Sequence, residues 1–350
     1  MKKLFKAVLK LLLLLLLAFA ALLAYLTFTE FDPAPREEIA VQFMKEDAAA
    51  LFGDTVRILT LNTGYAGLGS EADFFMDGGK ETRATDKDGV AENLRAMTAL
   101  IMETDADFTL LQEVDQNSTR SYGIDQQIAY PAETGLASAF ALNYNCDFVP
   151  IPFPPLGRIE SGIQTLTPHA VTAAERVSLP CAFEWPVSTA QMKRCLLITR
   201  TPIEGSDKEL VVINFHFEAY DNGEGKVAQT RAALAVLEEE YEKGNYVIAG
   251  GDFNQAFPGT LETYPVADPE TWMPGILEQS QLPVDWQFVF DPTVPTCRLL
   301  DAPYDAQTSQ HYIIDGFIVS PNVEVCSVSA ADLGFVNSDH NPVLLEAKLK

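Results

Sequence analysis

The sequence predicts an α+β domain in which two sheets pack on each other with helices outside, preceded by one N-terminal membrane helix. Three observations support this fold class. The chain opens with a long uncharged apolar run, seven later runs have strand-like composition, and two segments between those runs have helical periodicity. Most strand-like runs are apolar at successive positions, which is typical of strands buried on both faces. Sheets covered by helices provide that environment.

The first predicted element is a membrane-spanning helix. The run from Leu11 to Thr29 is 19 residues long, contains no charged residue and follows four lysines within the first ten positions. That length is sufficient for a helix to cross a bilayer, and lysines are retained on the cytoplasmic side. We therefore expect a signal anchor over residues 1–29, a single pass through the cell membrane and an extracytoplasmic remainder. Ala18 and Ala20 resemble a processing site, so cleavage and secretion stay an alternative.

The segment after the apolar run is predicted to be a linker over residues 30–54. It begins with Asp32-Pro33-Ala34-Pro35, which disfavours regular structure, and a short helix is expected from Glu37 to Leu51. The remaining residues, 55–350, are predicted to form one domain.

The predicted strands of this domain are rich in Val, Ile, Leu and Phe. Two helices separate them, each with an apolar stripe at helical spacing, and Gly244 is the expected stop of the second. The connections over 64–88 and 144–194 lack periodicity and are expected to be long loops. The strands are Val56–Asn62, Asp107–Val114, Cys195–Arg200, Leu210–Phe217, Tyr246–Ala249, Tyr312–Val319 and Pro342–Leu349; the helical stripes are Val90, Leu94, Met97, Ile101 and Val227, Leu234, Leu237, Tyr241.

Charge and cysteine content exclude several classes of protein. The net charge is −25, and residues 1–28 contribute four lysines and no acid, so the rest is still more acidic. Such acidity disfavours a protein that grips nucleic acid through its phosphates, although a bound metal ion can supply positive charge locally. Five cysteines are too few for a disulfide scaffold, and the absence of C-x-x-C spacing argues against a zinc knuckle. They are interpreted as small buried hydrophobes.

Polar side chains follow apolar runs at five places, and a sixth lies inside a run. A carboxylate embedded in an apolar strand is costly unless it is paired, so Asp315 requires a partner. Each motif alone is also compatible with an ordinary strand exit or turn. The five endings are Leu59-Thr60-Leu61-Asn62, Leu110-Leu111-Gln112-Glu113, Ile213-Asn214-Phe215-His216, Gly250-Gly251-Asp252-Phe253-Asn254 and Ser338-Asp339-His340-Asn341.

Together, these motifs resemble those of the metal-dependent endonuclease/exonuclease/phosphatase superfamily, in order and in spacing. The resemblance runs from about Val56 to Leu349 and suggests a membrane-anchored, bacterial-type member. It implies the deoxyribonuclease I-like fold, a four-layer α/β/β/α sandwich of two mainly antiparallel sheets, and a catalytic domain over 55–350. Two departures leave substrate preference open: Phe217 stands where many members have Leu, and Gly162 to Thr167 is a loose version of a segment that often contains Ser and Arg.

The resemblance implies a metal site. Glu113 would be the principal ligand, and Asn62 and Asp339 would complete or position the shell. Independently of the resemblance, carboxylate and amide donors without thiolates suit a hard cation, so the expected cofactor is Mg²⁺ or Mn²⁺.

The resemblance also implies catalytic roles. Asp252 would align and deprotonate the attacking water, and Asn254 would orient the phosphate. His340, held by Asp315, would present a proton donor to the phosphoryl oxygen. His216 would contact the phosphate or protonate the leaving group.

Three basic residues are possible substrate contacts. Lys80 and Arg83 are proposed from charge alone, because they lie in the first long connection. Arg120 follows the metal glutamate and would line the same cleft, and an exposed polar turn is the alternative for its segment.

The predicted function is that of a membrane-tethered, divalent-metal-dependent phosphoesterase, which hydrolyses a phosphodiester of nucleic acid, lipid or small-molecule type by metal-assisted in-line attack of water. The alternatives are a phosphomonoesterase acting on lipid head groups or soluble phosphoesters, and a catalytically silent surface-binding domain. The expected partners are the phosphoester substrate and the membrane, and no protein partner is inferred.

The apolar segment Phe148 to Pro155 is interpreted as a packed polyproline-like stretch rather than a membrane contact.

Overall fold

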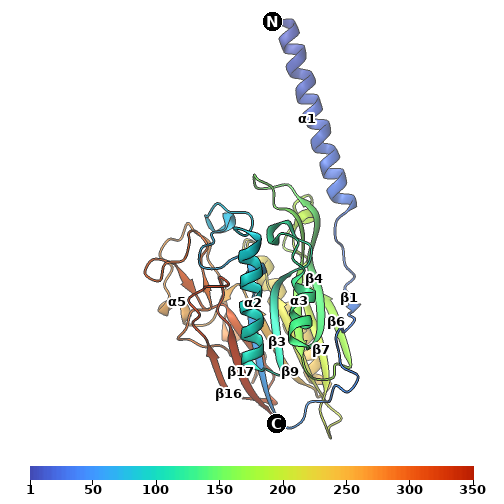
Figure 1. The fold of residues 1–350 in the computed structure, drawn as a ribbon, viewed down its shortest axis with the longest axis vertical. Helices are drawn as coiled ribbons and strands as arrows, with labels where there is room; N and C mark the ends of the chain where they lie inside the picture. The colour runs from blue at the N-terminus through green and yellow to red at the C-terminus, as the bar shows by residue number, and fades with distance from the viewer.

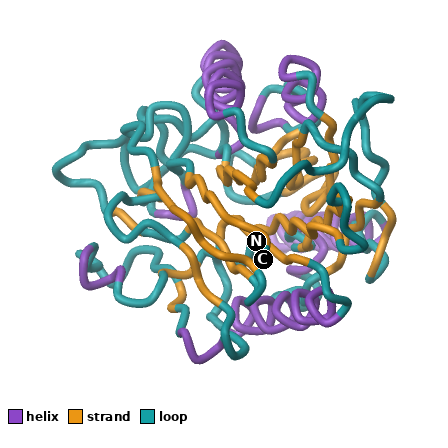
Figure 2. The backbone as a smooth tube through the Cα atoms, turned by 90° about the horizontal axis from the view of Figure 1, so that it is seen from below, coloured by secondary structure: helices purple, strands orange, loops and turns teal.

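Two sheets pack face to face between helices in the computed structural model, which describes residues 1–350 (Figure 1). Figure 2 shows the strands lying between helices on two opposite sides. In spatial order, one sheet contains β1 (Arg36–Glu38), β6 (Ala173–Ser178), β7 (Cys195–Pro202), β8 (Glu209–His216), β9 (Tyr246–Asp252), β15 (Asp315–Val319) and β12 (Gln287–Val289). The other contains β16 (Val323–Ala330), β17 (Val343–Leu349), β2 (Thr55–Asn62), β3 (Phe108–Asp115), β5 (Gly157–Thr167) and β4 (Ala137–Val149).

The remaining elements are short or helical. The α-helices are α1 (Lys2–Phe28), α2 (Lys87–Thr104), α3 (Gln126–Thr134), α4 (Glu224–Glu242) and α5 (Thr260–Thr263). The 3-10 helices are η1 (Gly64–Ala66), η2 (Phe75–Asp77), η3 (Thr119–Ser121), η4 (Val187–Ala190) and η5 (Gln279–Gln281). Two small ladders pair β10 (Gln255–Ala256) with β11 (Gly275–Ile276), and β13 (Cys297–Arg298) with β14 (His311–Tyr312).

The strands are buried on both faces, as their composition predicts. Ile58 and Leu110 point between the sheets and join Val212 of the opposite sheet in one core. The neighbouring residues point the other way, and Leu59 packs in the layer that contains Leu94 of α2. The helix α4 covers the outer face of the seven-stranded sheet in the same manner. The predicted four-layer α/β/β/α sandwich is therefore confirmed.

Both predicted apolar stripes lie in helices, and the second helix ends just before Gly244, as the sequence predicts. Asp86 caps α2, because its Oδ1 accepts a hydrogen bond from the backbone N–H of Gly89 at 2.7 Å. Gly244 follows α4 with a positive φ of 85°, a conformation that glycine adopts without steric cost.

Strand direction gathers several strand ends at one edge. β2 and β3 are parallel, as are β8 and β9, while the other pairs in the two large sheets are antiparallel. Four strands therefore end at one edge, and their antiparallel neighbours β15 and β17 begin there. Side chains at this edge come from six strands that are distant in the sequence.

The helix expected from Glu37 to Leu51 is not present. Instead, β1 extends the seven-stranded sheet through Arg36 opposite Val177. Leu51 is buried in the core between the sheets. Pairing with β6 at the sheet edge provides hydrogen-bond partners for the backbone of β1. This long-range pairing outweighs the local helix propensity.

The long connection expected over 144–194 is also wrong, because it contains the end of β4 and all of β5 and β6. Buried polar residues such as Gln164 and Thr165 interrupt the apolar pattern of β5, although the strand is almost fully enclosed.

The interpretation of the cysteines as buried holds for Cys146, Cys195 and Cys297 and is wrong for Cys181 and Cys326, which are exposed.

The helix α1 extends away from the two sheets (Figure 1). It has 27 residues and is long and apolar enough to span a membrane or to act as a signal sequence. Of its residues, only Leu26 is buried.

Candidate active site

Four predicted site residues lie at the ends of the parallel strands. Asn62 ends β2, His216 ends β8 and Asp252 ends β9, while Glu113 is near the end of β3. Asp315 begins β15 directly opposite Asp252 in the ladder. Carboxyl ends of neighbouring parallel strands are the usual place for ligand sites in open sheets.

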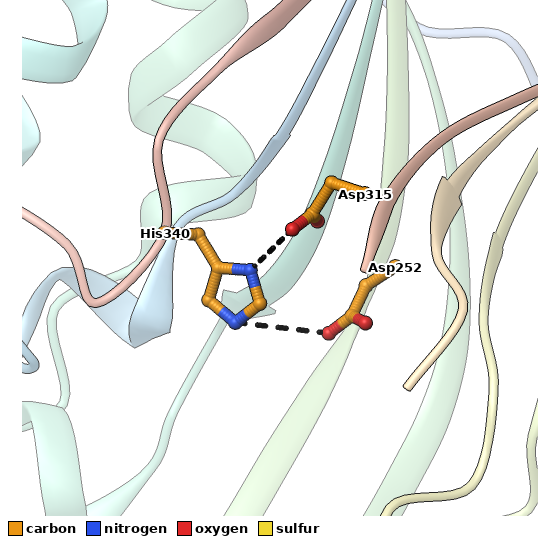
Figure 3. A group of neighbouring side chains, drawn as sticks. All are labelled: Asp252, Asp315 and His340. Carbon is orange, nitrogen blue, oxygen red and sulfur yellow. Dashed lines mark hydrogen bonds and ion pairs between the residues drawn. The ribbon is translucent and has the colours of Figure 1, made fainter. Parts of the chain in front are cut away.

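Asp315 and His340 form a buried pair. The imidazole Nδ1 lies 2.9 Å from Asp315 Oδ2, and the opposite ring nitrogen, Nε2, faces Asp252 Oδ2 at 3.8 Å (Figure 3). Burial would lower the pKa of His340, but the nearby carboxylates, above all Asp315, raise it well above its usual value. His340 is therefore a cation, and it is the partner that the sequence requires for Asp315.

Asp252 receives several contacts in the centre of the site. Its Oδ2 accepts a hydrogen bond from Asn62 Nδ2 at 3.0 Å and lies 3.3 Å from His216 Nε2. The backbone N–H of Asn254 donates to its Oδ1 at 2.8 Å. Burial and the neighbouring charge of Asp315 raise the pKa of Asp252 to about 7. A carboxylate with a pKa near neutrality is suited to accept a proton.

His216 has the opposite electrostatic character from His340. Burial first, and then the positive charges of Arg194 and His340, lower the pKa of His216 well below its usual value. Its Nδ1 is buried without a hydrogen-bond partner. The site therefore holds one charged and one neutral imidazole, which can donate and accept protons at different positions.

The residues predicted to hold a metal fit a hard divalent cation. A register shift between β3 and β5 accompanies a positive φ of 54° at Glu113, and the Glu113 side chain lines the cleft. Asn62 Nδ2 lies 3.4 Å from Glu113 Oε1. Burial raises the pKa of Asp339, which lines the same cleft, to about 6. The Asn62 amide oxygen accepts from the backbone N–H of Gly64, so the carboxylates of Glu113 and Asp339 are the donors in the cleft that suit Mg²⁺ or Mn²⁺.

Asp252, Asp315 and His340 also place three potential ligand atoms within 4.8 Å of one another. The protonated imidazole between the two carboxylates already supplies positive charge there. We therefore interpret this group as a device for proton transfer rather than as the metal site.

Three buried arginines line the cleft, and Arg194 has more donors without a partner than the other two. Arg120 is held by Asp115 through bonds of 2.9 and 3.1 Å. Arg298 donates to four backbone carbonyls. In contrast, Arg194 has Nε and Nη1 buried without a hydrogen-bond partner, with the nearest carboxylate, Glu218, at 3.5 Å. Arg194 is thus able to bind an anion in the cleft.

The sequence did not identify Arg194 as a site residue. Its only local signal is a basic pair, Lys193-Arg194, directly before a buried strand. The folded sheets place it in the cleft with His216 and Asp252, and no motif encodes that proximity.

The structure does not bring every predicted contact to the cleft. Lys80 is exposed and Arg83 is half-buried, and neither lines the cleft. Arg120 lines it, but Asp115 occupies much of its guanidinium and Glu113 lies 3.5 Å from Nη1. Asn254 also lines the cleft, and its Nδ2 donates to the carbonyl of Phe217 at 2.9 Å.

Comparison with known proteins extends these observations. No family model and no curated protein matches the chain. Among solved structures, an endonuclease/exonuclease/phosphatase from Beutenbergia cavernae DSM 12333 has a TM-score of 0.59 and 18% identity, and the match covers 85% of this chain and 72% of that one. ANGEL2, a 2',3'-cyclic phosphatase in complex with adenosine-2',3'-vanadate, has a TM-score of 0.55 and 14% identity, with 89% and 99% covered.

A third structure, D. rerio TDP2 complexed with single strand DNA product, has a TM-score of 0.51 and 16% identity, and the match covers 84% of this chain and 99% of that one. The similarity in each case extends over both sheets, since it covers more than four fifths of the chain. These neighbours confirm the fold that the resemblance implies, and the chain has the fold of the endonuclease/exonuclease/phosphatase superfamily.

Proposed function

We propose that this protein is a divalent-metal-dependent phosphoesterase that hydrolyses a phosphodiester by in-line attack of water. The observation that carries the proposal is one cleft lined together by Glu113, His216, Asp252 and His340, in which Asp315 holds His340 and His216 contacts Asp252. Two proteins of the same fold, TDP2 and ANGEL2, bind a DNA product and a nucleotide vanadate. We further propose that α1 anchors the protein in a membrane, with the catalytic domain on the extracytoplasmic side.

Asp252 is the residue best placed to take the proton of the attacking water. Its backbone contact to Asn254 and its side-chain contact to Asn62 fix the carboxylate, which leaves little freedom to lose on reaction. Its pKa near 7 makes it a stronger base than an ordinary aspartate.

His340 supplies a positively charged N–H donor for a phosphoryl oxygen. Asp315 accepts from Nδ1, so the ring presents Nε2 to the cleft. Fixed donors aimed at oxygens that gain charge in the transition state are among the largest contributions to catalysis.

Glu113, Asn62 and Asp339 would hold the divalent cation. When bound, the cation would neutralise charge on the phosphoryl group and stabilise the leaving oxygen.

Arg194 is placed to bind the substrate phosphate. Its Nε and Nη1 are buried in the cleft without a hydrogen-bond partner. A guanidinium binds phosphate oxygens through strong charge-assisted hydrogen bonds.

The test is hydrolysis by the full chain in detergent micelles. Bis-p-nitrophenyl phosphate, p-nitrophenyl phosphate and plasmid DNA are compared with Mg²⁺, with Mn²⁺ and with EDTA, and Asp252→Asn serves as the inactive control. The proposal predicts metal-dependent turnover of the diester that EDTA abolishes. Turnover of the monoester alone would establish the phosphomonoesterase alternative. Absence of turnover on all three substrates would favour the silent binding domain.

A further inference from the structure

The connection between β4 and β5 carries large apolar side chains into solvent. Ile151 is 72% exposed and Phe153 is 96% exposed. The interpretation of this segment as a packed stretch is therefore wrong. Prolines at four of the positions from 150 to 155 remove backbone N–H donors, so this tip cannot be covered by adding a regular strand. Exposed aromatic and aliphatic tips of this kind usually mark an interaction surface.

A second exposed apolar segment lies beside the end of α1. Trp185 is 60% exposed and Val187 is 52% exposed. The indole Nε1 of Trp185 donates to Thr27 Oγ1 in the last turn of α1 at 3.0 Å. Tryptophan is enriched where membrane helices leave the hydrocarbon region, because its ring is apolar and its N–H is polar.

The end of α1 is fixed to the same part of the domain. Leu26 packs with Cys146, Val149 and Ile159 of the β4–β5 hairpin. An ion pair of 2.6 Å between Lys193 and Glu30 holds the residues that follow α1. Figure 1 shows the hairpin pointing toward the end of the molecule from which α1 extends. A bilayer spanned by α1 therefore begins beside the exposed hairpin.

We propose that Ile151, Phe153, Trp185 and Val187, together termed the apolar rim, dock on the phospholipid bilayer that α1 spans. Apolar side chains gain free energy when they enter the boundary between head groups and acyl chains. Electrostatic attraction does not hold the domain there, because the chain beyond residue 28 is strongly acidic and anionic lipid repels it. The contact is therefore apolar and favours zwitterionic lipid.

Docking of the apolar rim would place the cleft at the level of the lipid head groups. Leu156 and Ile159 line the cleft and belong to the hairpin segment that follows the rim. Met192 lines it as well, a few residues after Val187. A phosphoester carried by a membrane amphiphile would reach Asp252 along this apolar wall. Docking rests on the proposed membrane anchor, and this step rests in addition on the proposed hydrolase activity.

Fluorescence quenching tests docking without reference to activity. The full chain carrying Trp185→Phe and Phe153→Trp is reconstituted in phosphatidylcholine vesicles with and without brominated acyl chains. The matched control is Trp185→Phe with Phe52→Trp, because Phe52 is 81% exposed and lies just before β2, at the opposite edge of the sheet from the site. Flotation confirms that both variants insert through α1.

The proposal predicts that brominated lipid removes most of the emission of the new tryptophan at position 153 and leaves that at position 52 unchanged. Equal emission of the position 153 variant in both lipids would overturn it, and so would equal quenching of the two variants.

Turnover then tests the consequence for substrate access. Ile151→Asp together with Phe153→Asp is expected to reduce hydrolysis of a vesicle-borne phosphodiester about tenfold or more, since about 1.4 kcal/mol of lost binding corresponds to a factor of ten. Hydrolysis of soluble bis-p-nitrophenyl phosphate should not change. An equal loss on both substrates would contradict a docking role, and activity on neither substrate in the unsubstituted chain would instead refute the proposed hydrolase.

Discussion

His340 Nδ1 and Asp315 Oδ2 lie 2.9 Å apart in a site where both residues are buried, and Asp252 faces the other side of the imidazole. This contact has two effects. The imidazolium supplies the counter-charge that a buried carboxylate needs, and the carboxylate fixes the orientation of the imidazole ring.

Asp315→Asn should reduce kcat/KM by roughly 10²- to 10⁴-fold, the range for loss of a positioned proton donor or its orienting group. The pKa of His340 is raised in the native protein, so its charged form is present below that pKa and is lost as pH rises through it. Without Asp315, His340 should lose its proton at a lower pH. The pH profile of kcat/KM for residual activity, with imidazole titration by NMR, checks this shift. An alkaline limb at the same pH as in the unsubstituted chain would contradict the assignment.

If Asp252 has the proposed role of accepting the proton of the attacking water, Asp252→Asn should reduce kcat by a factor of roughly 10² to 10⁴ while KM changes little. The single amide oxygen can accept only one of the two hydrogen bonds, which come from Asn62 to Oδ2 and from the backbone of Asn254 to Oδ1. The substitution also removes a buried charge and its desolvation cost, so the Tm, measured by circular dichroism, should change little. A fall in Tm that parallels the loss of activity would indicate a structural role.

Millimolar Mg²⁺ or Mn²⁺ should raise the Tm of the full chain, since the cation relieves repulsion among the carboxylates of the cleft. At a concentration of about 100 times Kd, the stabilisation is about 2.7 kcal/mol. Glu113→Gln should remove most of this increase, and Asp125→Asn, a change to the exposed cap of α3, should retain it. The same increase in both variants would exclude Glu113 as a ligand. Differential scanning fluorimetry gives the comparison.

Asn214→Leu should destabilise the domain by about 1 to 3 kcal/mol, the cost of leaving buried polar groups unpaired. Asn214 Oδ1 accepts from Gln112 Nε2 at 2.8 Å, and its Nδ2 donates to the carbonyls of Leu111 and Gln164. These bonds tie β8 to the opposite sheet. Urea unfolding provides the measurement, with the exposed Asn117→Ala as a control that changes stability by about 0.5 kcal/mol or less.

Glu240 should make the protein sensitive to acid at a place far from the cleft. Burial would raise the pKa of Glu240, but hydrogen bonds from Arg200 and Lys243 outweigh it and lower the pKa from 4.5 to about 2. The stabilisation is therefore complete above the unfolded value and is lost as pH falls through about 2. Glu240→Gln should remove roughly 1 to 3 kcal/mol at neutral pH. The free energy of unfolding, measured with urea from pH 7 to pH 2, should depend less on pH in the variant. An unchanged pH dependence would show that other groups cause the acid sensitivity.

The sequence predicts the site better than it predicts the surface around it. Asn62, Glu113 and Asp252 lie at strand ends that periodicity identifies, and strand direction alone brings such ends together. Arg194 and the exposed tip at Phe153 depend on how β4, β5 and β6 pack. Those strands bury polar side chains, so their composition does not distinguish them from loops, and their neighbours are set by long-range pairing.

The position of β17 determines when the six-stranded sheet can be completed during folding. This last strand lies between β16 and β2, so the sheet that begins at Thr55 lacks a central member until Leu349 has been synthesised. His340 also precedes β17 by only a few residues. Before this segment is synthesised, the chain lacks both the complete six-stranded sheet and the Asp315–His340 pair. Strands that are this far apart in the sequence pair slowly during folding. A chain that stops before His340 cannot form the pair that orients this imidazole.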